Sequence, residues 1–204
     1  MNDVDIVMQD LRDTLNILIN SKKSPKHTRK AFSEFTNLTQ KLTSVMRKNF
    51  TGDKWNALEF EGWNNVTALF KKLRNYEEHE EIIKTEIRET TSHTMTDPGW
   101  EGVTLCTSGT IKDVNPLSDK VPTANVVMYE ADPVTGRMTN IPVGAKRSVS
   151  YKYHLSISDS NKNSRPINKL LKKIGRKEPT HLASKCLETL EEYYEFYYKN
   201  NKII

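Results

Sequence analysis

The spacing of the hydrophobic residues changes near residue 97, and this change constrains the fold more than any other feature. Before it, hydrophobic residues recur at steps of three and four, the period of one face of an α-helix. After it, the chain carries segments rich in β-branched and aromatic residues, which are typical of strands. The predicted helices of the first part span 3–20, 26–48, and 54 into the seventies.

This pattern predicts an α+β fold in three segments. Residues 1–96 are expected to form a helical bundle, in which the charged stretch Glu77–Glu89 continues the third helix. Residues 97–160 are expected to form a small antiparallel β subdomain, and residues 161–204 two further helices that pack back on the bundle. The strands of the β subdomain are expected at 103–107, 124–129, 137–143 and 147–157. The last two helices are expected to meet between Gly175 and Pro179.

Composition excludes several classes of protein. No run of about 18 apolar residues exists, which argues against a membrane-spanning protein. The first residues carry acids where a signal peptide would carry bases, so we expect a cytoplasmic protein. Cys106 and Cys186 are too few for a disulfide framework, and no zinc-ligand spacing is present. We therefore expect two reduced thiols, no metal and no cofactor.

The basic residues are concentrated in one part of the chain. Residues 146–177 hold ten lysines and arginines against one acid, so this segment carries +9 while the whole chain carries +5. Such a concentration is typical of proteins that bind phosphates. A solvated surface without any partner is the alternative. The candidate phosphate-binding residues are Lys146, Arg147, Lys152, Arg165, Lys169, Lys172 and Lys173, and the resemblance described below makes RNA their expected ligand.

A short polar motif stands at the end of the third predicted helix. Residues 74–79 read Arg-Asn-Tyr-Glu-Glu-His, directly after the amphipathic stretch Val66–Leu73. This arrangement resembles the HEPN superfamily of metal-independent ribonucleases, whose motif is an Arg, commonly followed by Asn, and a His separated from the Arg by four to six residues. The resemblance covers residues 1 to about 95 and, more loosely, the last helix. The β-rich middle departs from the family pattern.

The resemblance implies an endoribonuclease with Arg74, Asn75 and His79 as catalytic residues. RNA cleavage needs a group that takes a proton from the ribose 2′-hydroxyl, and a histidine that titrates near neutrality suits this role. It also needs charge stabilisation at the phosphorus, which the forked arginine side chain provides. The asparagine would orient one of the two.

The helical geometry bears on how such a site is assembled. Positions 74 and 79 lie about 140° apart around an ideal helix axis, so one straight helix does not bring both side chains to one face. Either a helix irregularity or a composite cleft is required. HEPN sites usually form across a two-fold interface, so the resemblance implies a homodimer. It also implies a toxin or anti-phage defence effector that acts on tRNA or mRNA, with an antitoxin or defence-system protein as a possible partner.

Other interpretations remain open. Arg74 and His79 stand among four glutamates and can form ordinary surface ion pairs. The chain can also be a non-catalytic HEPN-like scaffold that binds a nucleotide or a protein, or a phage or mobile-element adaptor protein in which the motif is accidental. His154, on the polar side of a predicted strand in the basic segment, is an outside candidate for RNA contact.

Overall fold

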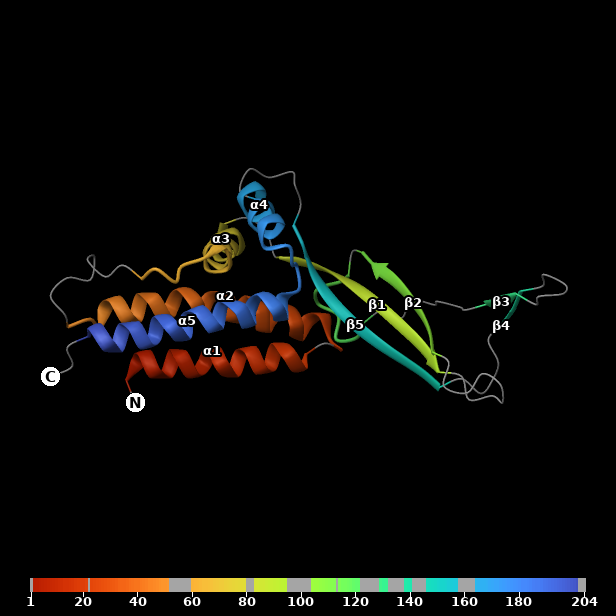
Figure 1. Cartoon of the computed structure of the whole chain (residues 1–204), viewed down its shortest axis with the longest axis horizontal. Coiled ribbons are helices and arrows are strands. Elements are labelled where there is room, and N and C mark those ends of the chain that lie inside the picture. The colour runs from red at the N-terminus through yellow and green to blue at the C-terminus, as the bar shows by residue number, and fades with distance from the viewer. Residues whose placement is uncertain are drawn as a thin grey trace.

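The structure, a computed structural model, confirms the α+β class. Its described part contains five helices, a three-stranded antiparallel sheet and a separate two-stranded ribbon (Figure 1). The helices form a body at one end of the molecule, and the three-stranded sheet extends away from this body. The described residues are 2–21, 23–51, 60–79, 83–94, 104–112, 114–121, 129–131, 138–140, 146–157 and 164–201.

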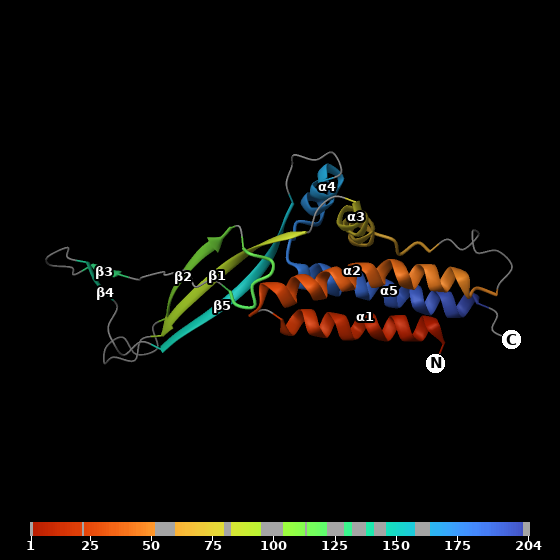
Figure 2. The ribbon, with the colours of Figure 1, turned by 180° about the vertical axis from the view of Figure 1, so that it is seen from behind.

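Three long helices lie side by side in the body: α1 (Asp3–Asn20), α2 (Pro25–Lys48) and α5 (Pro179–Asn200) (Figures 1 and 2). The first two begin and end within one residue of the positions that the periodicity predicts. A capping box fixes the start of α1, because the Asn2 side chain accepts from the Asp5 amide and the Asp5 carboxylate accepts from the Asn2 amide. The end of α5 lies beside this start.

Two shorter helices, α3 (Asn65–His79) and α4 (Ser164–Ile174), pack against each other, and α3 also packs against α2 and α5. The third helix begins later than the sequence predicts. Asn64 accepts hydrogen bonds from the amides of Val66 and Thr67 and so caps α3, and the residues before it form a turn. Residues 52–59, in which the start was expected, lie outside the described residues.

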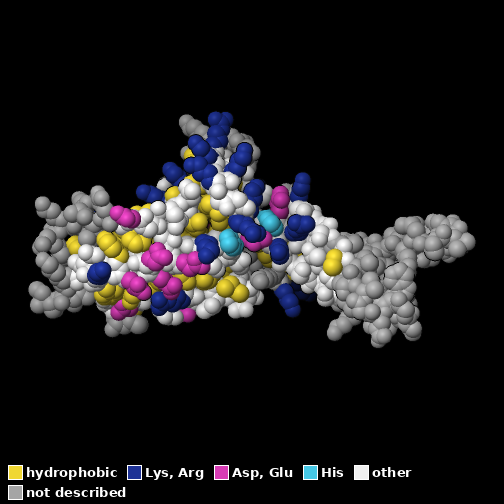
Figure 3. Space-filling view, in the orientation of Figure 1, with side chains coloured by type: hydrophobic (Ala, Val, Ile, Leu, Met, Phe, Trp, Pro, Cys, Tyr) yellow, Lys and Arg dark blue, Asp and Glu magenta, His cyan; other side chains and the backbone are white. Residues whose placement is uncertain are grey.

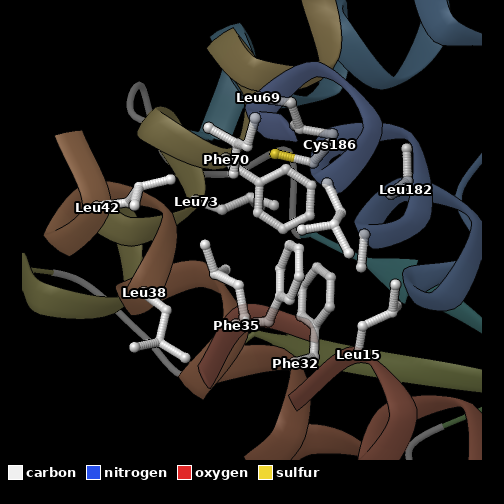
Figure 4. Packing of buried hydrophobic residues seen from close by; sticks show 14 of the residues in the cluster. Leu15, Phe32, Phe35, Leu38, Leu42, Leu69, Phe70, Leu73, Leu182 and Cys186 are labelled. Carbon is white, nitrogen blue, oxygen red and sulfur yellow. The ribbon is translucent and has the colours of Figure 1, made fainter. Parts of the chain in front are cut away.

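Aromatic rings fill the core between α2, α3 and α5. Phe70 of α3 lies 5.7 Å from Phe32 and 5.4 Å from Phe35 of α2, measured between ring centroids. Figure 4 shows the sulfur of Cys186 beside the Phe70 ring. Burial raises the pKa of the Cys186 thiol, so this cysteine stays protonated, whereas Cys106 is exposed.

The three-stranded sheet has the order β2–β1–β5, with all neighbours antiparallel. Its strands are β1 (Lys84–Thr94), β2 (Thr104–Ile111) and β5 (Lys146–Ser156). Strands β2 and β5 confirm two of the predicted segments. As the alternation predicts, Tyr153 and Leu155 of β5 are both buried.

The helical continuation expected over Glu77–Glu89 is wrong from Lys84 onward, because that part forms β1. The signal was ambiguous. Ile83 and Ile87 are both buried, and a spacing of four residues fits one face of a helix and one face of a strand equally well. This segment forms a strand because it pairs with β2 on one side and with β5 on the other. The sheet therefore takes its central strand from before the boundary that the sequence predicts at residue 96.

The remaining two strands, β3 (Tyr129–Ala131) and β4 (Met138–Asn140), form an antiparallel ribbon in which Glu130 pairs with Thr139. Strand β3 begins at the last residue of the strand predicted at 124–129, and β4 lies within the returning strand predicted at 137–143. The turn predicted between them, 132–136, lies outside the described residues, as does most of the strand expected at 124–129.

Candidate nucleic-acid interface

The motif residues Arg74 and Asn75 lie on the outer side of α3. Leu73 and Tyr76 are buried in the core, so the intervening positions turn toward solvent. The Arg74 side chain is 36% exposed, and Asn75 is exposed. The backbone of His79 ends α3, but its side chain lies outside the described residues. The structure therefore leaves two of the three predicted catalytic residues accessible and does not place the third side chain.

The two acids that follow Arg74 lie in different surroundings. Glu78 forms an ion pair with Arg74, with Oε1 and Nη2 2.5 Å apart. Glu77 is partly buried against α2, where it accepts a hydrogen bond of 3.0 Å from the Ser33 hydroxyl. Burial raises the pKa of the Glu77 carboxyl above its ordinary 4.5. One carboxylate thus competes for Arg74, and the other is directed away from the surface.

Helix α3 is described as one unbroken α-helix from Asn65 to His79. Positions 74 and 79 therefore remain about 140° apart around its axis. The sequence allows either a helix irregularity or a composite cleft, and the unbroken helix excludes the first. A site that uses both side chains then requires a second copy of the motif or another surface.

The basic helix α4 packs directly against α3. Its apolar side is anchored by the buried residues Ile167 and Leu171. The predicted RNA-binding residues on its other side are all exposed: Arg165, Lys169, Lys172 and Lys173. On the face drawn in Figure 3, lysine and arginine side chains gather over α4 and the adjoining end of the sheet, while acidic side chains gather on the body of long helices.

The other predicted bases belong to β5. Lys152 is exposed and pairs in register with Arg88 of β1, so both lie on the same face of the sheet. Lys146 and Arg147 begin β5, but their side chains lie outside the described residues. The basic segment thus divides between α4 and the sheet. Arg88 was not predicted as a member of this basic surface, because the residues around it were assigned to a helix. The signal that points to it is the alternation of side chains about Ile87, which a strand would produce.

A groove of about 510 Å³ runs between α2, α3 and α5 and was not predicted. It is lined by hydroxyl, amide and apolar groups, with the half-exposed Trp63 at its wall. Thr67, Lys71 and Arg74 recur at steps of four and three along α3, so the groove's α3 wall leads toward Arg74. Lys71 and Arg74 therefore lie about one turn apart on the same side of α3.

Comparisons of the chain with known protein families, with curated proteins and with solved structures found no match. Within the described part of the chain, no group of three or more potential metal ligands lies together. None of the described helices is both long and apolar enough to cross a membrane.

Proposed function

We propose that this protein binds RNA on the surface formed by α3 and α4, and cleaves it without metal at a site that contains Arg74, Asn75 and His79. One observation carries the proposal: the packing of α4 against α3 brings the basic segment onto the helix that carries Arg74, although the two are far apart in the sequence. Exposed lysines on one helix and an accessible arginine on the helix packed against it suit a phosphate backbone.

The chemistry follows from the residue types. The ribose 2′-oxygen attacks the adjacent phosphorus, and the bond from phosphorus to the 5′-oxygen of the next nucleotide breaks. His79 takes the 2′-hydroxyl proton or supplies one to the departing 5′-oxygen. Arg74 stabilises the charge on the phosphoryl oxygens, and Asn75 orients one of these groups. The products are a 2′,3′-cyclic phosphate and a free 5′-hydroxyl.

The unbroken helix α3 supports a composite site. Because positions 74 and 79 lie about 140° apart, Arg74 of one copy acts with His79 of a second copy across a two-fold interface. The resemblance to HEPN ribonucleases supports the same homodimer. It also supports a role as a toxin or defence effector under the control of a partner protein.

Incubation of the purified protein with total RNA in EDTA tests the activity. Arg74→Ala and His79→Ala should each reduce cleavage by on the order of 10²-fold or more. Arg12→Ala is a matched control, because Arg12 forms a comparable exposed ion pair with Glu191 on the body of long helices. His27→Ala, at a largely exposed histidine, is the control for the second variant. Both controls should cleave as the wild type does.

Mixing the two inactive variants tests the composite site. A heterodimer of Arg74→Ala and His79→Ala contains one site in which both residues are intact. After random exchange of subunits, activity should return to about a quarter of the wild-type rate. No recovery in a mixture that is shown to contain heterodimers contradicts the composite site. If the wild type and every variant leave the RNA intact, and RNA binding depends on α4, the results would instead favour a non-catalytic scaffold.

A further inference from the structure

A polar cavity of about 430 Å³ lies where the sheet meets the linker between α4 and α5. It is separate from the α3 surface, since none of its lining residues belongs to α3. Each of the three strands contributes to it, and the linker contributes one lysine. The lining side chains that carry the argument are Glu86, Arg88, Ser108, Thr110, His154 and Lys177.

The alternation of the strands builds this cavity. Ile87 of β1 and Tyr153 of β5 pair in register and are both buried on one face of the sheet. Their neighbours Arg88 and His154 must therefore lie on the opposite face. The residue across from Arg88 on β2 is Thr110, which lies on that same face. Hydrophobic burial on one side thus collects charged and polar groups on the other.

The linker is fixed to the sheet edge. Gly175 ends α4 with a φ of 72°, a conformation that favours glycine. The chain then turns back, and the carbonyl of Lys177 accepts a hydrogen bond of 2.8 Å from the amide of Leu155 on β5. This bond holds the Lys177 backbone one residue along the strand from His154, and it directs the lysine to the cavity.

His154 carries the observation that points to a ligand. Its Nε2 atom is buried and has no hydrogen-bond partner within the described part of the chain. A buried polar atom without a partner is costly and is rare in proteins. A bound group that accepts a hydrogen bond at this position removes the cost.

The charges define the chemistry of that group. Two cations, Arg88 and Lys177, line the cavity against one carboxylate, Glu86. The Glu86 carboxylate already accepts a hydrogen bond from the Ser156 hydroxyl. Exposed Lys84 and Lys152 lie on the same face of the sheet and add positive charge at the margin. Cations together with hydroxyl donors suit a tetrahedral oxyanion.

We propose that this cavity binds a phosphate group, with Arg88 and Lys177 as its cations and Nε2 of His154 as a buried hydrogen-bond donor. An RNA phosphodiester and a free phosphate or phosphate monoester share this chemistry. The site uses no residue of α3, so it stands without the proposed ribonuclease activity. Only its use by RNA depends on that proposal.

Titration of the full chain with inorganic phosphate tests the site. The ring resonance of His154 is followed by NMR on protein labelled at histidine and is assigned with His154→Gln. Phosphate should shift this resonance saturably, and sodium chloride at matched ionic strength should not. Arg88→Gln and Lys177→Gln should each weaken phosphate binding by about tenfold. Glu86→Gln should strengthen it by roughly threefold, and Lys41→Gln on α2 should leave it unchanged. Equal shifts with chloride, or variants that bind phosphate as the wild type does, would overturn the proposal.

Two further titrations separate the sources of the phosphate. An RNA oligonucleotide with hydroxyl groups at both ends tests the internal phosphodiester, and a nucleoside 5′-monophosphate tests the monoester. A shift of the His154 resonance by either ligand supports the site and identifies its source. Arg74→Ala should leave the phosphate titration unchanged, so failure of the ribonuclease proposal and failure of this one give different results.

Discussion

Arg74 and Glu78 form an ion pair one helical turn apart on α3, with 2.5 Å between Nη2 and Oε1. A phosphate that binds Arg74 must compete with this carboxylate. We therefore expect Glu78→Gln to strengthen RNA binding by about two- to fivefold, the range that corresponds to an exposed ion pair. Stability should fall by less than about 0.5 kcal/mol, because such pairs on helix surfaces contribute little.

Fluorescence anisotropy with a labelled RNA and urea unfolding measure these two effects. Glu188→Gln is the matched control, since Glu188 pairs with Lys185 at a similar spacing on the surface of α5. Glu188→Gln also removes one negative charge, but far from Arg74, so it should change RNA affinity less than Glu78→Gln does. Weaker binding by Glu78→Gln than by the control would contradict a role for Arg74 in phosphate contact.

Glu77 should make the stability of the protein depend on pH. Burial raises the pKa of its carboxyl above 4.5, so the folded state disfavours the ionised form. The resulting penalty is present above the raised pKa and is lost as the pH falls toward 4.5. Glu77→Gln removes the charge and keeps an oxygen that accepts from Ser33. This variant should therefore unfold at a higher urea concentration than the wild type at pH 7, and the difference should narrow toward pH 4.5.

The comparison requires both proteins to be measured by urea unfolding at each pH. Glu34→Gln on the same helix as Ser33 provides a control at a carboxylate without the Ser33 contact. A difference between Glu77→Gln and the wild type that widens on acidification would contradict the assigned cause.

Much of the helical architecture could be predicted, because long amphipathic helices carry many repeats of one period. The first two helices and the final pair follow from that signal. Strand β1 could not be predicted from that signal, because the spacing of Ile83 and Ile87 fits both the helical and the strand period. Its partner strand β5 also lies more than 50 residues away in the chain. Local patterns do not contain that information.

The candidate sites divide in the same way. The motif at Arg74 and the charge of α4 are properties of contiguous sequence, so both were predicted. The cavity at His154 depends on strand register and on the bond between Leu155 and Lys177, which only the tertiary structure supplies. His154 was noted as an outside candidate, but Arg88 was assigned to a helix, and the linker contact could not be inferred.

The start of α1 should depend on a tyrosine hydroxyl. Tyr198 donates a hydrogen bond of 2.5 Å to Asp5, and this bond is the main cause of the lowered pKa of the Asp5 carboxyl. The stabilisation is present above the ordinary pKa of 3.8 and is lost as the pH falls through the lowered value. Tyr198→Phe should cost about 1 kcal/mol at pH 7, and the cost should shrink below pH 3.8.

Urea unfolding of Tyr198→Phe across this pH range checks the prediction. Tyr193→Phe is the control, because no hydrogen bond of the Tyr193 hydroxyl is found within the described part of the chain. A constant difference between Tyr198→Phe and the wild type at all pH values would show that the lost bond does not act through the Asp5 charge.

The lysines of α4 should control how RNA binding responds to salt. Each phosphate contact with single-stranded RNA contributes about 0.7 to the slope of log affinity against log salt concentration, because bound counterions are released. Lys169, Lys172 and Lys173 are exposed on the helix that packs against α3. Replacing all three with Gln should weaken RNA binding and make the slope shallower by about two units.

Anisotropy titrations between low and moderate salt measure the slope. The matched control replaces Lys41, Lys48 and Lys199, three exposed lysines on α2 and α5, and removes the same total charge. If α4 makes the contacts, only the first triple variant changes the slope by that amount. Equal slopes for the two variants would mean that net charge, and not the exposed lysines of α4, attracts the RNA.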